Sequence, residues 1–253
     1  MIKRIRLKDD KKHIDINCDL GEGIGNESEL MPFISSCNIA CGGHAGDEET
    51  IKNVIALAKE NNVKIGAHPS FPDRENFGRE EMKIGKKELK NSLHDQISLV
   101  QEICKKQGVT MHHIKPHGAL YNLCNIDEKY AQIVLEILIK SHPQTVLYAP
   151  YKSVISELAK GKIKVNFEGF ADRNYEDNHT LVSRKKTEAL LHENRAVLDH
   201  VLRMAKHYQI KTISGKIIAT KANTICVHGD TPEAVKMVKF LHENLPKNGV
   251  HIS

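Results

Sequence analysis

The chain has 253 residues, of which 40% are hydrophobic and 5% aromatic, and its formal net charge is +5 at pH 7. This length suits a single α/β barrel, and the apolar fraction is enough to fill its core. No apolar run approaches the roughly 18 residues that cross a bilayer, and the start of the chain lacks the apolar segment of a secretory signal. We therefore expect a cytoplasmic protein without a membrane partner.

Most of the positive charge lies in residues 1–12, where six Lys or Arg residues stand against two Asp. We interpret this segment as a basic, solvated tail that precedes a single domain over residues 13–253. No stripe of basic residues with interleaved aromatics follows it, so we expect no nucleic-acid partner. The six cysteines form no Cys-x-x-Cys pair. They therefore predict buried thiols of a reducing compartment, not disulfides or a zinc knuckle.

Apolar stretches of strand length alternate with amphipathic helical patterns along the chain. The predicted strands are 14–18, 37–41, 63–67, 112–116, 146–149, 164–168 and 224–228. Helical spacing of apolar residues occurs over 51–58, 89–104, 191–205 and 234–241, and Thr231-Pro232 predicts the start of the last helix. A hairpin over 211–214 and 216–219 decorates the last connection. Strand–helix alternation of this kind predicts a parallel sheet.

The two faces of the predicted strands differ in polarity, which favours a closed barrel over an open sheet. Asp15, Asn17 and Asp19 share one face of the first strand, as His113 and Lys115 do in the fourth. A parallel strand covered by helices on both faces would be apolar throughout. Since an unpaired buried polar group costs roughly 1–3 kcal/mol, these side chains have to converge on a polar lumen. We predict a seven-stranded α/β barrel whose interior is a substrate site.

Ionisable side chains gather where the predicted strands end, which is the end at which barrel enzymes carry out catalysis. The candidates for catalysis are Asp19, Glu22, His44, His68, Lys115, His117 and His228. A carboxylate can act as a general base, Lys115 can stabilise an oxyanion, and imidazoles can transfer protons or bind metal. Each residue alone also fits a turn or a hydrogen-bonded structural role. Four histidines at the ends of four strands favour the functional interpretation.

A second set of residues in the same loops suits an anionic substrate. The candidates for substrate binding are Gly43, Asp47, Arg79, Glu168, Asp172, Arg173 and Asp230. Loops 42–47 and 229–231 expose backbone N–H groups at predicted helix starts, and either Arg79 or Arg173 offers a fork that matches a carboxylate. The alternatives are a helix cap for Asp47 and a surface ion pair for Asp172 and Arg173.

A divalent metal is a further possibility, because Asp19, His44 and His68 would form a His₂-carboxylate site. The sequence contains no Walker A motif and no G-x-G-x-x-G after a strand. A G-x-S-x-G nucleophile elbow is also absent. We therefore expect neither a nucleotide site nor a serine nucleophile in this chain.

Six ordered motifs resemble the LamB/YcsF family, namely IDINCDLGEG, NIACGGHAGD, GAHPSFPD, KPHGALYN, FADRNY and ICVHGDTPEA, over about residues 14–245. The resemblance implies a distorted seven-stranded β/α barrel related to polysaccharide deacetylases. It also implies one subunit of an ATP-dependent 5-oxoprolinase, which converts 5-oxoproline to L-glutamate together with partner subunits B and C. Gly43 stands where the family usually has an aromatic residue, which we expect to reshape the pocket floor, and Ser183 stands where proline is common.

The residues and the resemblance together predict a subunit that hydrolyses an activated lactam, with Asp19 as general base for the attacking water. ATP would be used by the complex at a site outside this chain. One alternative is a stand-alone metal-dependent deacetylase or amidohydrolase with ligands His44, His68 and Asp19, which metal content would distinguish. The other is a non-catalytic barrel that binds the substrate as a scaffold, although a scaffold needs no ionisable lumen.

Overall fold

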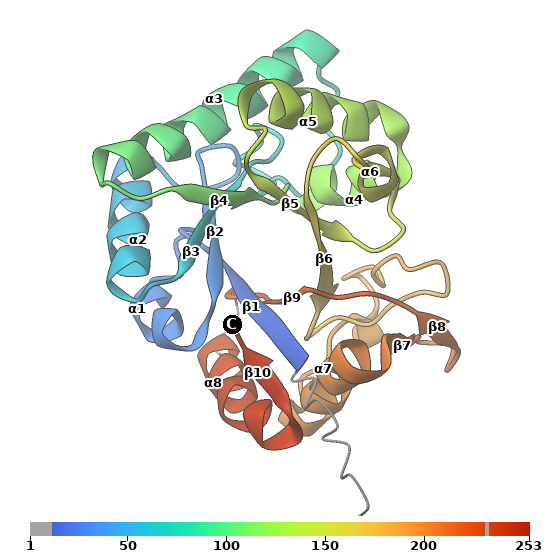
Figure 1. Ribbon diagram of the computed structural model, residues 1–253. Coiled ribbons are helices and arrows are strands. Elements are labelled where there is room, and N and C mark those ends of the chain that lie inside the picture. Colours follow the sequence, from blue (N-terminus) through green and yellow to red (C-terminus); the bar gives the residue numbers. More distant parts are fainter. Residues whose placement is uncertain (1–11, 231–232) are drawn as a thin grey trace, which may run out of the picture.

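The computed structural model describes residues 12–230 and 233–253, which form a ring of strands with helices outside it (Figure 1). The strands are β1 (Lys12–Leu20), β2 (Ser36–Ala40), β3 (Lys64–His68), β4 (Met111–Ile114), β5 (Val146–Pro150), β6 (Val165–Phe170), β7 (Gln209–Lys211), β8 (Ile217–Ala219), β9 (Thr224–Val227) and β10 (Val250–Ile252). The α-helices are α1 (Glu27–Leu30), α2 (Glu48–Glu60), α3 (Lys86–Lys106), α4 (Gly118–Ile126), α5 (Glu128–Ser141), α6 (Val154–Leu158), α7 (Asn194–His207) and α8 (Ala234–Asn244). Short 3₁₀ helices are η1 (Met31–Phe33), η2 (Thr187–Ala189) and η3 (Pro246–Asn248).

Seven parallel strands close into a barrel in the order β1-β2-β3-β4-β5-β6-β9, because β9 also pairs with β1. This confirms the predicted seven-stranded barrel. The closing register places Asp15 opposite Thr224 and Cys18 opposite Val227. β7 and β8 form an antiparallel hairpin, as expected for the last connection. The sequence did not predict β10, which pairs in parallel with the first residues of β1.

The alternation of side chains in β1 decides what faces the helices and what faces the lumen. Ile14, Ile16 and Cys18 belong to a hydrophobic core that runs from Ile14 to Val250 between the strands and the surrounding helices. The intervening Asp15 and Asn17 instead form hydrogen bonds with polar side chains of the neighbouring strands β2 and β9. The predicted helical stripes are buried as expected, for instance over 51–58 of α2. None of the helices within the described ranges is long and apolar enough to span a bilayer.

Several boundaries differ from the prediction for local reasons. β4 ends at Ile114 instead of residue 116, because Pro116 has no N–H for the sheet and disfavours regular structure before it. β6 continues to Phe170, so Glu168 lies inside the strand instead of at its end. α7 begins at Asn194, three residues after the start at residue 191 that the helical spacing predicted. Residues 1–11 of the predicted tail and the predicted helix start at Thr231-Pro232 lie outside the described residues.

Candidate functional site

Seven ionisable side chains from five strands or the loops after them meet at the carboxyl end of the barrel. They are Asp19 near the end of β1 and Glu22 just after it, His44 after β2, His68 in β3, Lys115 and His117 after β4, and His228 after β9. They gather because parallel strands in a closed barrel all end on one face. The structure thus brings together the residues that the sequence indicated as candidates for catalysis.

Three buried imidazoles each have one ring nitrogen held by a fixed acceptor. His68 donates from Nδ1 to the backbone carbonyl of Lys115 at 2.7 Å, and His117 donates from Nε2 to the carbonyl of Phe77 at 3.0 Å. The Ser70 hydroxyl gives its hydrogen to the carbonyl of Phe71, so its oxygen accepts from His44 Nδ1 at 3.0 Å. The remaining nitrogen of each ring is therefore a free lone pair when the ring is neutral.

These three free nitrogens converge on the carboxylate of Glu22. Glu22 Oε1 lies 3.1 Å from His44 Nε2, 3.5 Å from His117 Nδ1 and 3.9 Å from His68 Nε2. His117 Nδ1 is 3.0 Å from His68 Nε2, and the rings of His44 and His117 stack at 3.6 Å. Burial lowers the pKa of both His44 and His117, and the neighbouring imidazoles lower it further. Two neutral lone pairs at 3.0 Å repel each other, so this arrangement has the electrostatics of a cation site.

Lys115 lies buried between two carboxylates beside this cluster. Its ammonium is 2.9 Å from Asp19 Oδ1, 3.0 Å from Glu168 Oε1 and 3.1 Å from Cys226 Sγ. Burial disfavours the charged ammonium, but Asp19, Cys226 and Glu168 outweigh it and raise the pKa of Lys115 well above its ordinary value. Asp19 is likewise buried, yet His68 and Lys115 hold its pKa well below the ordinary value. Both side chains are charged at neutral pH.

His228 forms a separate dyad with Asp172 on the β6–β9 side of the barrel. Its Nδ1 lies 2.9 Å from Asp172 Oδ2, and its ring stacks on Phe170. Burial opposes ionisation of Asp172, but His228 outweighs it and lowers the pKa of the carboxyl. Groups of His228, Asp19 and Cys226 lie within 4.8 Å of one another. A carboxylate that holds one imidazole nitrogen leaves the other to give or take a proton.

Arginines surround the more exposed rim near Asp230. Arg79 donates to Asp230 Oδ2 at 2.8 Å, and Arg184 approaches the same oxygen at 3.3 Å. Arg173 is buried and donates to the carbonyl of Val182, while its Nε has no partner among the described residues. Two arginines therefore share one carboxylate oxygen at the rim, and the buried Arg173 keeps one N–H without a partner among the described residues.

Three predicted substrate-binding residues have other surroundings. Asp47 is exposed and accepts from the N–H of Thr50 at 2.8 Å, which confirms the predicted helix cap. Glu168 accepts from Tyr121, Asn17 and Lys115 inside the lumen. A side chain at Gly43 would begin 2.4 Å from Ser70 Oγ and 2.5 Å from Gln96 Oε1, so Gln96 fills the space expected to be a reshaped pocket floor.

Sequence reasoning did not assign Ser70, Tyr121, Gln96, Cys226 or Arg184 to the site. Ser70 follows His68 in the GAHPSFPD motif, so its place in a motif was the available signal. Gln96 lies on the buried face of α3 and holds both the N–H and the carbonyl of Ser70. A polar residue on an otherwise apolar helical face is a signal of this kind.

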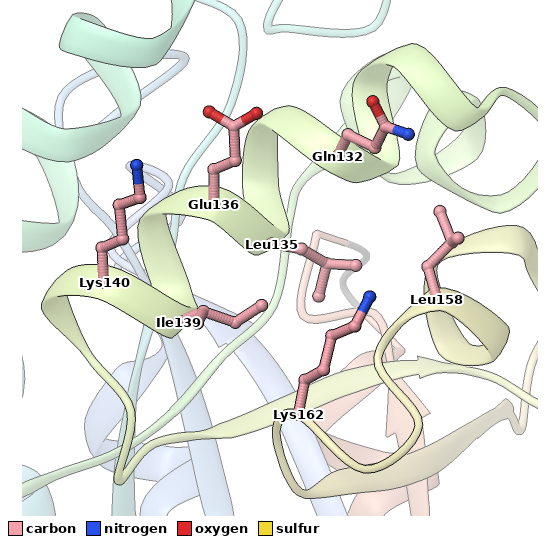
Figure 2. Close-up of a pocket in the computed structure, with 7 residues that line it drawn as sticks. All are labelled: Gln132, Leu135, Glu136, Ile139, Lys140, Leu158 and Lys162. Carbon is pink, nitrogen blue, oxygen red and sulfur yellow. The ribbon is translucent and has the colours of Figure 1, made fainter.

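A surface pocket between α5 and α6 is separate from this site (Figure 2). Its lining residues are Gln132, Leu135, Glu136, Ile139, Lys140, Leu158 and Lys162. None of the residues that converge at the barrel mouth contributes to it. The pocket is lined by aliphatic side chains and the long stems of charged residues, and it offers no histidine or cysteine for catalysis.

The sequence matches the profile of the LamB/YcsF family over residues 14–253. The chain belongs to the LamB/YcsF family. Proteins similar to this chain include one from Histophilus somni named as the A subunit of 5-oxoprolinase, with 40% identity over 96% of this chain and 98% of that protein. A protein of Thermococcus sibiricus with the same name is 40% identical over 94% of this chain and 96% of its own length.

Solved structures agree with this family membership. The lactam utilization protein from Thermus thermophilus superposes with a TM-score of 0.89 and 31% identity, over 95% of this chain and 98% of that one. A family 4 carbohydrate esterase from Streptomyces lividans aligns with a TM-score of 0.50 and 10% identity, over 96% and 92% of the two chains. At that identity the second similarity concerns the fold alone.

Proposed function

We propose that this chain is the A subunit of an ATP-dependent 5-oxoprolinase, a hydrolase that opens the lactam of 5-oxoproline to give L-glutamate. The observation that carries the proposal is identity of about 40% over nearly the whole length of proteins named as the A subunit of 5-oxoprolinase. Similarity to a lactam utilization protein points to the same substrate class. The buried ionisable site adds to it, because a scaffold that only binds the substrate has no need of such a lumen.

The activation of the lactam carbonyl is assigned to ATP and the partner subunits. A five-membered lactam is a stable amide, so its carbonyl needs activation before water attacks it. The sequence has no nucleotide-binding motif. We assign the activation to subunits B and C, which would use ATP to produce a phosphorylated form of the substrate. The complex would work in the cytoplasm, in keeping with six free cysteines, all buried.

Among the described residues, we assign a divalent metal ion to the group of Glu22, His44, His68 and His117, in which Glu22 stands in place of the Asp19 that the sequence suggested. Their ligand atoms lie within 4.8 Å of one another, and each imidazole is oriented through its other nitrogen, as metal-bound histidines are. Nitrogen and carboxylate ligands of this kind suit zinc or a related transition metal. A bound divalent cation would act as a Lewis acid that polarises the substrate carbonyl.

The other residues have roles that follow from their surroundings. Asp19 is ionised and takes the proton of the attacking water, which adds to the carbonyl carbon of the activated lactam. The ring C–N bond then breaks, and His228, oriented by Asp172, protonates the ring nitrogen. The phosphoryl group stays on the new carboxyl as an acyl phosphate, which a second water hydrolyses to L-glutamate and inorganic phosphate. Lys115 keeps Asp19 ionised and in place. Either Arg79, which lies with Arg184 at Asp230 on the rim, or the buried Arg173 binds the carboxylate of the substrate.

Reconstitution tests this function directly. The chain is mixed with subunits B and C, ATP and 5-oxoproline, and glutamate is followed over time. We expect turnover in the complete mixture and none when ATP or either partner is omitted. Turnover by the isolated chain without ATP would contradict the proposal.

The second candidate function is a stand-alone metal-dependent amidohydrolase, which the His–Glu cluster specifically favours. Glutamate formation from 5-oxoproline, or acetate release from an acetylated sugar, by the metal-loaded chain alone would support this candidate instead. The carbohydrate esterase likeness concerns the fold and does not decide the substrate.

Metal binding is tested separately from activity. Zn²⁺ is titrated into metal-free protein, with calorimetry and melting temperature as readouts. We expect one ion per chain and a higher melting temperature for the wild type, and loss of both effects in His44→Ala/His117→Ala. His142→Ala/His200→Ala is the matched control, because these buried histidines lie outside the cluster. Equal Zn²⁺ binding by both double variants would contradict the site.

A further inference from the structure

His113 lies in the lumen beneath the site and has no role in the steps above. It belongs to β4 and is fully buried. Its ring stacks on Tyr148 with centroids 3.9 Å apart and planes at 9°. On the other side, a Cβ added to Gly66 would lie 2.2 Å from His113 Nε2, so the ring edge rests against the bare backbone of that glycine. The imidazole is therefore confined at one face by Tyr148 and at one edge by Gly66.

One amide connects this ring to the carboxylate of Asp19. His113 Nε2 lies 2.7 Å from Asn38 Oδ1. Asn38 Nδ2 in turn donates to Asp19 Oδ1 at 2.8 Å and to Asn17 Oδ1 at 2.7 Å. Both amide hydrogens of Asn38 are thereby used, and the bond to Asp19 is a charge-assisted one.

The neighbours of Asn38 decide which way its amide points. Asn17 directs its Nδ2 to Glu168 and Thr224, so it presents an oxygen to Asn38. A reversed Asn38 amide would place its own oxygen against the oxygens of Asn17 and Asp19, which repel it. Asn38 Oδ1 therefore faces His113, and the hydrogen of this bond belongs to His113 Nε2.

The second nitrogen of His113 is consistent with a single proton on the ring. His113 Nδ1 lies 3.2 Å from His112 Nδ1, which can donate to it. Burial, together with the nearby His112 and Lys115, lowers the pKa of His113 well below its ordinary value. The ring is neutral at physiological pH, with its hydrogen on Nε2.

We propose that His113 is a positioning residue, which fixes the amide of Asn38 so that Asn38 donates to Asp19 Oδ1. Asp19 Oδ1 also accepts a hydrogen bond from Lys115, so the two donors occupy both of its lone pairs. Asp19 Oδ2, which faces His68 at 3.5 Å, is then the oxygen that takes the proton of the attacking water. The inference rests on the proposed function, in which Asp19 is the general base.

A double-mutant cycle in the reconstituted complex tests this relay. The variants are His113→Phe, which keeps a ring against Tyr148, Asn38→Ala, and the two combined. Each single change should lower kcat by roughly 10- to 100-fold, the effect of one hydrogen bond to a charged group, with KM changed less than about 3-fold. The combined variant should be no slower than the slower single variant, because His113 acts only through Asn38. Losses that multiply would assign His113 a separate structural role and overturn the proposal.

Two further variants guard against a misfolded His113→Phe protein. Gly66→Ala keeps the imidazole but pushes the ring away, so it should lower kcat by a similar factor. His142→Phe is the matched control, because His142 is also buried but its ring nitrogens have no partner among the described residues. It should turn over like the wild type. A fully active and folded Gly66→Ala protein would contradict the relay.

Nitrogen NMR of the isolated full chain gives a readout that does not depend on activity. The imidazole signals of His113, assigned by their loss in His113→Phe, should show a neutral ring protonated at Nε2 at pH 7. The side-chain amide hydrogens of Asn38 should exchange slowly and become faster in His113→Phe. A ring protonated at Nδ1 would overturn the proposal whatever the activity. If the wild-type complex has no turnover, the proposed function fails and the catalytic part of this inference fails with it, whereas the NMR result still decides the orientation of Asn38.

Discussion

Asp19 is kept ionised by its neighbours instead of by water. It is only 8% exposed, so burial alone would favour the neutral acid, yet His68 and Lys115 outweigh burial and lower its pKa. The carboxylate is therefore available as a base throughout the physiological pH range. Because its pKa lies far below 7, the pH dependence of turnover near neutrality should come from the histidines.

The variant Asp19→Asn keeps the shape of the side chain and removes its charge. If Asp19 is the general base, turnover in the reconstituted complex should fall by about 10²–10⁴, the usual contribution of positioned proton transfer. Substrate binding should survive, because the rim arginines are untouched. Asp199→Asn, on the exposed face of α7, is the control and should be fully active. A stable and fully active Asp19→Asn protein would move the role of base to Glu22 or a histidine.

Lys115→Met removes the buried cation and leaves Asp19 and Glu168 without their common partner. Removing one member of a buried ion pair typically destabilises a protein by about 3–5 kcal/mol, which urea unfolding at pH 7 would measure. Without the ammonium, the pKa of one of these buried carboxyls in the folded variant should rise above its value in the unfolded chain. The folded variant then binds a proton more readily than the unfolded chain does, so its free energy of unfolding should partly recover as the pH falls towards 5. Lys140→Met on the surface should change the free energy of unfolding by less than about 0.5 kcal/mol. A loss that does not shrink at low pH would contradict the charge argument.

At the scale of single elements, α7 contains a buried histidine outside the site. Burial lowers the pKa of His200 to about 4, below its ordinary value of 6.5. The unfolded chain therefore binds a proton that the folded chain excludes, which makes folding less favourable as the pH falls from 6.5 towards 4. This loss of stability is small above about pH 7 and amounts to about 2 kcal/mol at pH 5.

His200→Phe should remove this part of the acid sensitivity. The difference in free energy of unfolding between pH 7 and pH 5 should be smaller by about 2 kcal/mol than in the wild type. His192→Gln, an exposed histidine just before the same helix, should leave that difference unchanged. Equal pH dependence in the wild type and His200→Phe would show that His200 is protonated in the folded protein.

Elements were predictable from the sequence where the polarity of the residues repeats with a regular period. Strand β1 and helix α2 have strict periods of two and 3.6 residues, and both appeared close to their predicted places. β10 was missed because three residues are too few to show a period and their pairing partner is at the other end of the chain. The same alternation predicted that the side chains of Asp19 and Lys115 point into the lumen.

Contacts within the site were less accessible to sequence reasoning. The bond from Asn17 to Thr224 joins residues 207 positions apart, and that from His113 to Asn38 joins residues 75 apart. No local pattern specifies which lumen side chains meet, because this depends on the registers of all seven strands together. The motifs therefore predicted the seven ionisable residues that meet at the barrel mouth, whereas neighbours such as Gln96 and Cys226, and the pairings of all of them, came from the structure.

The molecule as a whole is a ring in which the first and last described strands are neighbours. Lys12 lies opposite Val250 and Ile14 opposite Ile252 in the β1–β10 ladder. The seam between β9 and β1 is made like the other strand pairs of the barrel. A chain that began at another point of the ring could therefore make the same set of contacts between strands.

A circular permutant should therefore fold. Ser253 would be joined to Lys12 by a short Gly-Ser linker, and new ends would be opened at Gly215 in the turn between β7 and β8, whose neighbours Ser214 and Lys216 are exposed. We expect this permutant of residues 12–253 to keep the circular dichroism spectrum and the Zn²⁺ titration of the wild type. New ends inside β4 instead should abolish folding, since they break the strand that carries His113. For this barrel, the ring of contacts would then determine the folded protein, whichever surface turn carries the chain ends.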